Sequence, residues 1–194
     1  MTEGSTFFEG GGAVQKSLRK ITKRLGELAI PYAVVGGMAL FQHGLRRFTE
    51  DVDLLVTAAS LKAIHERLEG LGYLPPFAGS KQLRDTETGV KIEFLVAGEY
   101  PGDGLPKPVS FPDPATAAVD LNGIPCVNLQ TLVELKIASG MTGAGRLKDL
   151  ADVEQLIIVL KLPRDYGRPL NPYVQAKYDE LWLSAQPRDE TKKD

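Results

Sequence analysis

The fold of this chain is decided by residues 32–56, which read YAVVGGMALFQHGLRRFTEDVDLLV. A short β-prone apolar run, Tyr32 to Val35, ends at the pair Gly36-Gly37, and an apolar segment with helical spacing follows directly. This order predicts a strand, a tight turn and a helix N-terminus. Because glycine tolerates positive φ and has no Cβ, backbone N–H groups at such a turn can approach an anion. We interpret the glycine pair as a phosphate-binding turn.

A second apolar run, Val52 to Val56, carries two acidic residues near its start, Asp51 and Asp53. Residues two positions apart on a strand point to the same face, so these carboxylates can share a metal ion. Each feature alone has an ordinary alternative: a glycine pair can be a simple strand–helix connection, and Asp-x-Asp can be a solvated strand end. Thirteen residues lie between Gly37 and Asp51, enough for one short helix that returns the chain beside the first strand.

In this order and spacing, the glycine pair and the Asp51-x-Asp53 pair resemble the signature of the nucleotidyltransferase superfamily built on a DNA polymerase β-like catalytic core. The resemblance implies an enzyme that uses Mg²⁺ or Mn²⁺ to transfer a nucleoside monophosphate from an NTP to a hydroxyl group. It implies that Asp51 and Asp53 are catalytic metal ligands and that Gly36 and Gly37 bind the nucleotide phosphates. Many members of the superfamily carry serine at the position of Gly37, so one phosphate contact is weakened here.

A third carboxylate lies on a later strand. Residues 81–85 and 90–96 read as two strands joined by the polar turn 86–89, which together form a hairpin. Strand alternation puts Lys91 and Glu93 on one face of the second strand. By itself, Glu93 would be an outward-facing glutamate on a half-buried strand. In the resembled superfamily a third carboxylate arrives on such a strand.

The resemblance therefore implies that Glu93 completes a catalytic, metal-binding site with Asp51 and Asp53, and that it binds the metal or accepts the proton of the acceptor hydroxyl. Three carboxylates in one site repel one another, so we expect the site to be strained when no cation is bound.

The C-terminal half carries a second pattern. Residues 132–138 read LVELKIA, and residues 146–152 read RLKDLAD. They resemble the Leu-x-x-x-Lys … Arg-x-Lys-Asp-x-x-Asp pattern of bacterial abortive-infection toxins, which are nucleotidyltransferases of type IV toxin–antitoxin pairs. The resemblance implies that Lys136 contacts the nucleotide phosphates, that Asp149 is needed for activity and that an antitoxin protein is a partner. The alternative is a solvated helix with ordinary ion pairs, such as Lys148 with Asp152.

The bulk composition is that of an ordinary globular protein, with 194 residues, 43% hydrophobic and 25% charged. The net charge of −2 shows no general basic character, so RNA is neither required nor excluded as a partner. No apolar run reaches membrane-spanning length, and residues 1–12 lack the blocks of a signal peptide, so we expect a cytoplasmic protein with no membrane partner. The single cysteine, Cys126, is expected in the core.

The predicted fold class is α/β (α+β), with a mixed, mostly antiparallel sheet backed by helices at 14–28, 37–44 and 60–71, the last one capped by Ser60. Its strands are expected near 32–35, 52–56, 82–86 and 90–96, with a further short strand at 124–127. We expect a flexible arm at 1–12, the nucleotidyltransferase core at 13–97, an irregular connector at 98–123, a mainly helical part at 124–184 and a disordered tail at 185–194.

The sequence defines neither the base of the NTP nor the acceptor, which could be RNA, a protein or a small molecule. Arg46 and Arg47 are given no role. A catalytically silent nucleotide-binding or protein-interaction module on the same fold is the alternative function, and the intact set of Asp51, Asp53 and Glu93 argues against it.

Overall fold

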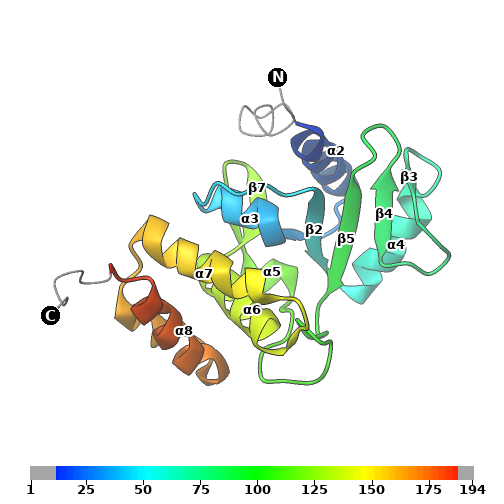
Figure 1. Cartoon of the computed structure of the whole chain (residues 1–194). Coiled ribbons are helices and arrows are strands. Elements are labelled where there is room, and N and C mark those ends of the chain that lie inside the picture. The colour runs from blue at the N-terminus through cyan, green and yellow to red at the C-terminus, as the bar shows by residue number, and fades with distance from the viewer. Residues whose placement is uncertain (1–11, 188–194) are drawn as a thin grey trace, which may run out of the picture. The chain divides into compact units, whose positions relative to one another are not determined.

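The computed structural model describes residues 12–187, so residues 1–11 of the expected N-terminal arm and residues 188–194 of the expected tail lie outside the described residues. Its strands are β1 (Ala33–Val35), β2 (Asp51–Val56), β3 (Tyr73–Leu74), β4 (Gln82–Asp85), β5 (Lys91–Val96), β6 (Ala118–Leu121) and β7 (Ile124–Val127). Within the described residues these strands form one sheet in the order β3-β4-β5-β2-β1-β7-β6. Figure 1 labels β3, β4, β5, β2 and β7 of this sheet. The pairs β2–β5 and β1–β7 are parallel, and the other neighbours are antiparallel. The prediction of a mixed, mostly antiparallel sheet is confirmed.

Helices form close to the expected ranges 14–28, 37–44 and 60–71, and further helices follow later in the chain. The helices are α2 (Ala13–Glu27), α3 (Gly36–Gln42), α4 (Ala58–Leu68), α5 (Pro114–Ala117), α6 (Leu129–Thr142), α7 (Leu147–Leu160), the 3-10 helix η1 (Arg164–Gly167) and α8 (Pro172–Ser184). None of the helices in residues 12–187 is long and apolar enough to cross a membrane.

The prediction that Ser60 caps α4 is wrong. The helix begins two residues earlier, at Ala58, because alanine is the best helix former and extends the helix toward its N-terminus. The cap is therefore Thr57, whose hydroxyl oxygen accepts a hydrogen bond from the Ser60 N–H at 3.0 Å.

Part of the expected irregular connector is regular, because residues 114–121 form α5 and β6. Strand β6 pairs with β7 across a two-residue turn, Asn122-Gly123, in which both residues have positive φ, 57° and 79°. Asn-Gly favours this hairpin turn because both residues tolerate the left-handed region. The prolines and glycines of the connector obscured this signal in the sequence.

The central strands β2 and β5 separate the core from the polar face of the sheet. Val52, Leu54, Ile92 and Phe94 are buried on one side of these strands, where the His65 ring of α4 lies 6.4 Å from the Phe94 ring, measured between centroids. The alternate residues in the first half of both strands, Asp51, Asp53, Lys91 and Glu93, are half-buried and charged. The side chain of Cys126 is buried as predicted. Strand alternation thus places the polar residues of β2 and β5 together, away from the core.

The described chain divides into two compact units. One contains the residues up to Glu99 together with Ser110–Leu132, and thus the whole sheet; the other contains Tyr100–Val109 and the residues from Val133 onward. The second unit is helical from Val133 onward. Among its contacts, Arg164 of η1 pairs with Asp179 of α8, and the Tyr178 hydroxyl donates a hydrogen bond to the Pro163 carbonyl at 3.0 Å.

Helix α2 is fixed to the β4–β5 hairpin by a buried carboxylate, Asp85. Its oxygens accept hydrogen bonds from the Ser17 hydroxyl at 2.9 Å, from the Lys20 ammonium at 2.7 Å and from the Glu87 N–H at 3.0 Å. Burial raises the pKa of Asp85, but the hydrogen bonds from Lys20, Glu87 and Ser17 outweigh it and hold this pKa below its ordinary value.

We expect Asp85→Asn to lower the free energy of unfolding by about 2–4 kcal/mol, because the substitution leaves Lys20 without its buried partner. The contribution of Asp85 is fully present above about pH 4, its ordinary pKa, and is lost as the pH falls below that value. Urea denaturation at pH 7 and pH 3 measures both effects. Glu27→Gln on the exposed side of α2 is the control, with an expected change below about 0.5 kcal/mol. Equal losses in the two variants would contradict the anchoring role of Asp85.

Candidate active site

Three carboxylates converge on the polar face of the sheet. Asp51, Asp53 and Glu93 each offer one carboxylate oxygen, and these atoms all lie within 4.8 Å of one another. The register of the parallel pair β2–β5 explains this arrangement, since Asp53 stands directly opposite Glu93 and Asp51 lies two positions earlier on the same face. The structure therefore brings together all three acidic residues that the sequence analysis selected.

The glycine turn lies directly against this cluster. Val35, the last residue of β1, is paired with Asp53, so Gly36 enters α3 beside the Asp53 carboxylate. Gly36 has φ of 64°, and a Cβ added to it would lie 1.9 Å from Asp53 Oδ2. Glycine is thus required at position 36 for two reasons: the backbone has positive φ, and the Asp53 carboxylate fills the space that a side chain would need.

The second glycine is packed against a threonine that the sequence analysis did not select. A Cβ added to Gly37 would lie 2.7 Å from both Cβ and Oγ1 of Thr49, whose side chain is buried. The Thr49 hydroxyl also donates a hydrogen bond to Asp51 Oδ1 at 3.3 Å. Thr49 therefore connects the glycine turn to the first carboxylate, and its hydroxyl lies beside Gly37. Its only sequence signal is its place two residues before Asp51.

Lys91 is the second residue that the sequence analysis left without a role. Its ammonium lies 3.0 Å from Asp51 Oδ2 and 2.9 Å from Glu93 Oε2. Burial lowers the pKa of Lys91, but the hydrogen bonds to Glu93 and Asp51 outweigh it and hold this pKa well above its ordinary value. The ammonium relieves the repulsion that we expected among three carboxylates. Its sequence signal was the strand alternation that puts it on the same face as Glu93.

The residues of this cluster fit a divalent cation. Carboxylate oxygens are the ligands that hard cations such as Mg²⁺ and Mn²⁺ prefer. A lysine ammonium held by two of the three acids shows that a positive charge is stabilised at this place. Asp51, Asp53 and Glu93 are therefore the residues that could hold the metal.

The other two selected residues, Lys136 and Asp149, belong to the second unit. The Lys136 ammonium on α6 lies 2.9 Å from Asp149 Oδ1 and 2.8 Å from Asp152 Oδ2, both on α7. Asp149 also accepts a hydrogen bond from the Ser139 hydroxyl at 2.7 Å. All three charged side chains are only 8% exposed. Asp152 thus pairs with Lys136 on the neighbouring helix.

These contacts give Lys136 and Asp149 a structural role. Burial raises the pKa of Asp149, but the charge of Lys136 and the hydrogen bonds from Lys136 and Ser139 outweigh it and keep this pKa below its ordinary value. The cluster holds α6 and α7 together. The role in nucleotide binding that the toxin resemblance implies stays a prediction.

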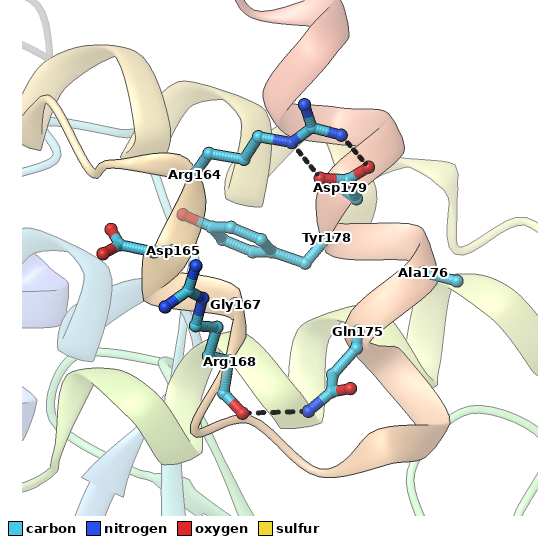
Figure 2. A pocket seen from close by; sticks show the side chains of 8 residues that line it. All are labelled: Arg164, Asp165, Gly167, Arg168, Gln175, Ala176, Tyr178 and Asp179. Carbon is cyan, nitrogen blue, oxygen red and sulfur yellow. Dashed lines mark hydrogen bonds and ion pairs between the residues drawn. The ribbon is translucent and has the colours of Figure 1, made fainter.

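A cavity of about 420 Å³ lies between η1 and α8 of the second unit and contains none of the selected residues. Figure 2 shows the Arg164 guanidinium turned toward Asp179, with two hydrogen bonds of 2.6 and 2.7 Å. Because this charge is already paired within the wall of the cavity, the carboxylate cluster is the better candidate for the active site.

We expect Gly36→Ala to lower the free energy of unfolding by about 2–4 kcal/mol, because a Cβ at this position meets the Asp53 carboxylate and the backbone has positive φ. Gly26→Ala in α2 is the matched control. An added Cβ there has nothing within 4 Å, so this variant should be equally stable or up to about 1 kcal/mol more stable. Urea denaturation compares the two. A Gly36→Ala variant as stable as the wild type would mean that Asp53 is not held against the turn.

We expect Lys136→Met to lower the free energy of unfolding by about 3–5 kcal/mol, because two buried carboxylates lose their counter-ion. Lys177→Met on α8 removes an equal charge from the ion pair with Glu180, which is open to solvent, and should change stability by less than about 0.5 kcal/mol. Thermal and urea denaturation without nucleotide measure both variants. Unchanged stability of Lys136→Met, together with lost nucleotide binding, would instead favour a phosphate contact.

Comparisons with known proteins address the fold. The sequence matches no protein-family model and no curated protein. Among solved structures, the chain is similar to a candidate nucleotidyltransferase from Thermotoga maritima, with 17% identity and a TM-score of 0.51 over 73% of this chain and 91% of that one. It is also similar to the antibiotic-resistance factor ANT(2'')-Ia, with 12% identity and a TM-score of 0.51 over 86% of this chain and 89% of that one. The chain has the nucleotidyltransferase fold that the resemblance of residues 32–56 implied.

Proposed function

We propose that this protein is a metal-dependent nucleotidyltransferase that moves a nucleoside monophosphate from an NTP to a hydroxyl group. The observation that carries the proposal is the convergence of Asp51, Asp53 and Glu93 within 4.8 Å, directly beside the turn at Gly36. The nucleotidyltransferase fold supports it. Neither an acidic cluster nor a glycine turn would be enough by itself to support this function. Here the pairing of β1 with β2 places the glycine turn beside the acidic cluster.

The residues of the site have two kinds of role: some would hold the metal ion, and others would position the phosphates or a metal ligand. Asp51, Asp53 and Glu93 would hold Mg²⁺ or Mn²⁺, which when bound supplies positive charge to neutralise the triphosphate as the reaction proceeds. Backbone N–H groups of Gly36 and Gly37 would contact the phosphates, since neither glycine carries a side chain of its own. Thr49 would keep Asp51 in place through its hydrogen bond.

The transfer itself is a displacement at phosphorus. The oxygen of the acceptor hydroxyl forms a bond to the α-phosphorus of the NTP, and the bond from that phosphorus to the oxygen bridging it to the β-phosphate breaks. Pyrophosphate leaves with the electron pair of the broken bond. Glu93 would accept the proton of the hydroxyl, and because its side chain is 32% exposed it can pass this proton to water.

The acceptor and the biological role are finer proposals. RNA, a protein or a small molecule could supply the hydroxyl; with a net charge of −2, RNA would need a local basic patch. The toxin role and the antitoxin partner are supported by the resemblance of residues 132–152. Growth arrest on induced expression, relieved by Asp53→Asn, would support the toxin role. The cytoplasmic location stays a prediction.

We expect Asp51→Asn, Asp53→Asn and Glu93→Gln each to lower nucleotide transfer by about 100-fold or more, because each removes a charged ligand from the metal site. The purified protein is incubated with each α-labelled NTP, Mg²⁺ or Mn²⁺, and pools of RNA, protein or small-molecule acceptors. Glu50→Gln is the matched control, since it changes the same charge one residue before Asp51 but outside the carboxylate cluster, and it should retain transfer.

The same experiment tests the alternative function. A wild-type protein that binds metal and NTP but labels no acceptor would favour a silent nucleotide-binding module. Transfer that survives in Asp53→Asn would contradict the proposed site.

A further inference from the structure

We propose that the Lys91 ammonium is a built-in cation that competes with the divalent metal for Asp51 and Glu93, so that it must leave this position when the metal binds. This inference rests on the proposed function, because it assigns a role to Lys91 within the same site. In the metal-free protein the Lys91 ammonium holds the Asp51 and Glu93 carboxylates in position, and it moves away from them when the metal binds.

The competition follows from shared oxygens. Lys91 Nζ contacts Asp51 Oδ2 at 3.0 Å and Glu93 Oε2 at 2.9 Å, and these carboxylates are two of the three that could hold the metal. A divalent ion on the same oxygens would lie close to a second positive charge in a half-buried place, where water screens repulsion less than in bulk solvent. The two cations therefore exclude or weaken each other.

Lys91 differs in this respect from Lys136, another lysine that is paired with two acids. Lys136 and its partners Asp149 and Asp152 are each 8% exposed, so that ion cluster is closed. Lys91 is 36% exposed, Asp51 33% and Glu93 32%. Both clusters have the same chemistry, but of these two the one at Lys91 is open enough to exchange its cation with solvent.

The backbone allows this exchange without disturbing the sheet. Lys91 is the first residue of β5, and its position opposite Asp51 is fixed by the pairing of β5 with β2. The flexible four-carbon stem of lysine can carry the ammonium outward while the strand stays paired. Asp53 provides a third carboxylate within 4.8 Å of these two, so a metal at this cluster would have three acidic ligands.

The first test measures Mn²⁺ affinity without nucleotide, by the electron paramagnetic resonance signal of free Mn²⁺. Lys91→Met removes the competing charge and keeps most of the side-chain length. We expect it to bind Mn²⁺ about tenfold more tightly than the wild type or better. Lys62→Met is the matched control, because it also removes one ion-paired lysine from the first unit, at an exposed site on α4, and should bind Mn²⁺ as the wild type does.

Two outcomes of this test would overturn the inference about Lys91 but not the proposed function. Equal affinity of wild type and Lys91→Met would mean that the ammonium does not compete, and weaker binding by Lys91→Met would mean that it only orders the ligands. Binding of Mn²⁺ by none of the proteins would overturn the metal site itself, and with it the proposed function.

The second test uses the wild-type chain, so it does not depend on the folding of a variant. Acetic anhydride labels exposed lysines, and mass spectrometry of the digest reads the extent of labelling at each one. We expect saturating Mg²⁺ to raise the labelling of Lys91 several-fold while Lys62 in the same digest is unchanged. Labelling of Lys91 that Mg²⁺ leaves unchanged or lowers would overturn the inference.

Discussion

The parallel pairing of β2 with β5 is the constraint on which the candidate site depends. It sets Asp53 opposite Glu93 and Asp51 opposite Lys91, so one register fixes both the acids and the cation between them. A slip by one residue would turn every side chain of a strand to the other face and would place Val52 or Ile92 where the carboxylates now stand. The buried residues that alternate with the acids prevent such a slip, because the core needs them on its side. Core packing and site geometry are therefore specified by the same alternation.

The remaining parts of the site are attached to this pair through β1. Its antiparallel pairing with β2 brings the end of the strand, and thus the glycine turn, beside Asp53. The turn leaves no room for a side chain at Gly36, because the Asp53 carboxylate occupies the space, and none at Gly37, because Thr49 does. The proposed phosphate contact and the packing against Asp53 and Thr49 therefore both require glycine at positions 36 and 37. Neither leaves room for a side chain on this backbone.

Much of this could be predicted from the sequence, because it depends on local periodicity. Alternation with period two placed Asp51 and Asp53 on one face, and the same rule grouped Lys91 with Glu93. The sequence could not show that Lys91 lies opposite Asp51, since register between strands some 40 residues apart is set by the packing of the whole sheet. The partners of Lys136 were missed for a similar reason, as they depend on how α6 and α7 pack. The β6–β7 hairpin is different, because its Asn122-Gly123 turn is a local signal that the sequence carries among the prolines and glycines of the connector.

The order of the strands has a consequence for how the protein folds. The three acids come from two strands that are neighbours in the sheet but are separated along the chain by α4, β3 and β4. Such non-local pairing forms slowly, because the intervening chain must be ordered first. Until β5 has docked against β2 the chain holds only the Asp51-x-Asp53 pair, so the complete ligand set belongs to the native state alone. A metal that needs all three acids therefore cannot guide the early steps of folding, and it acts afterward, by drawing the equilibrium toward the finished sheet.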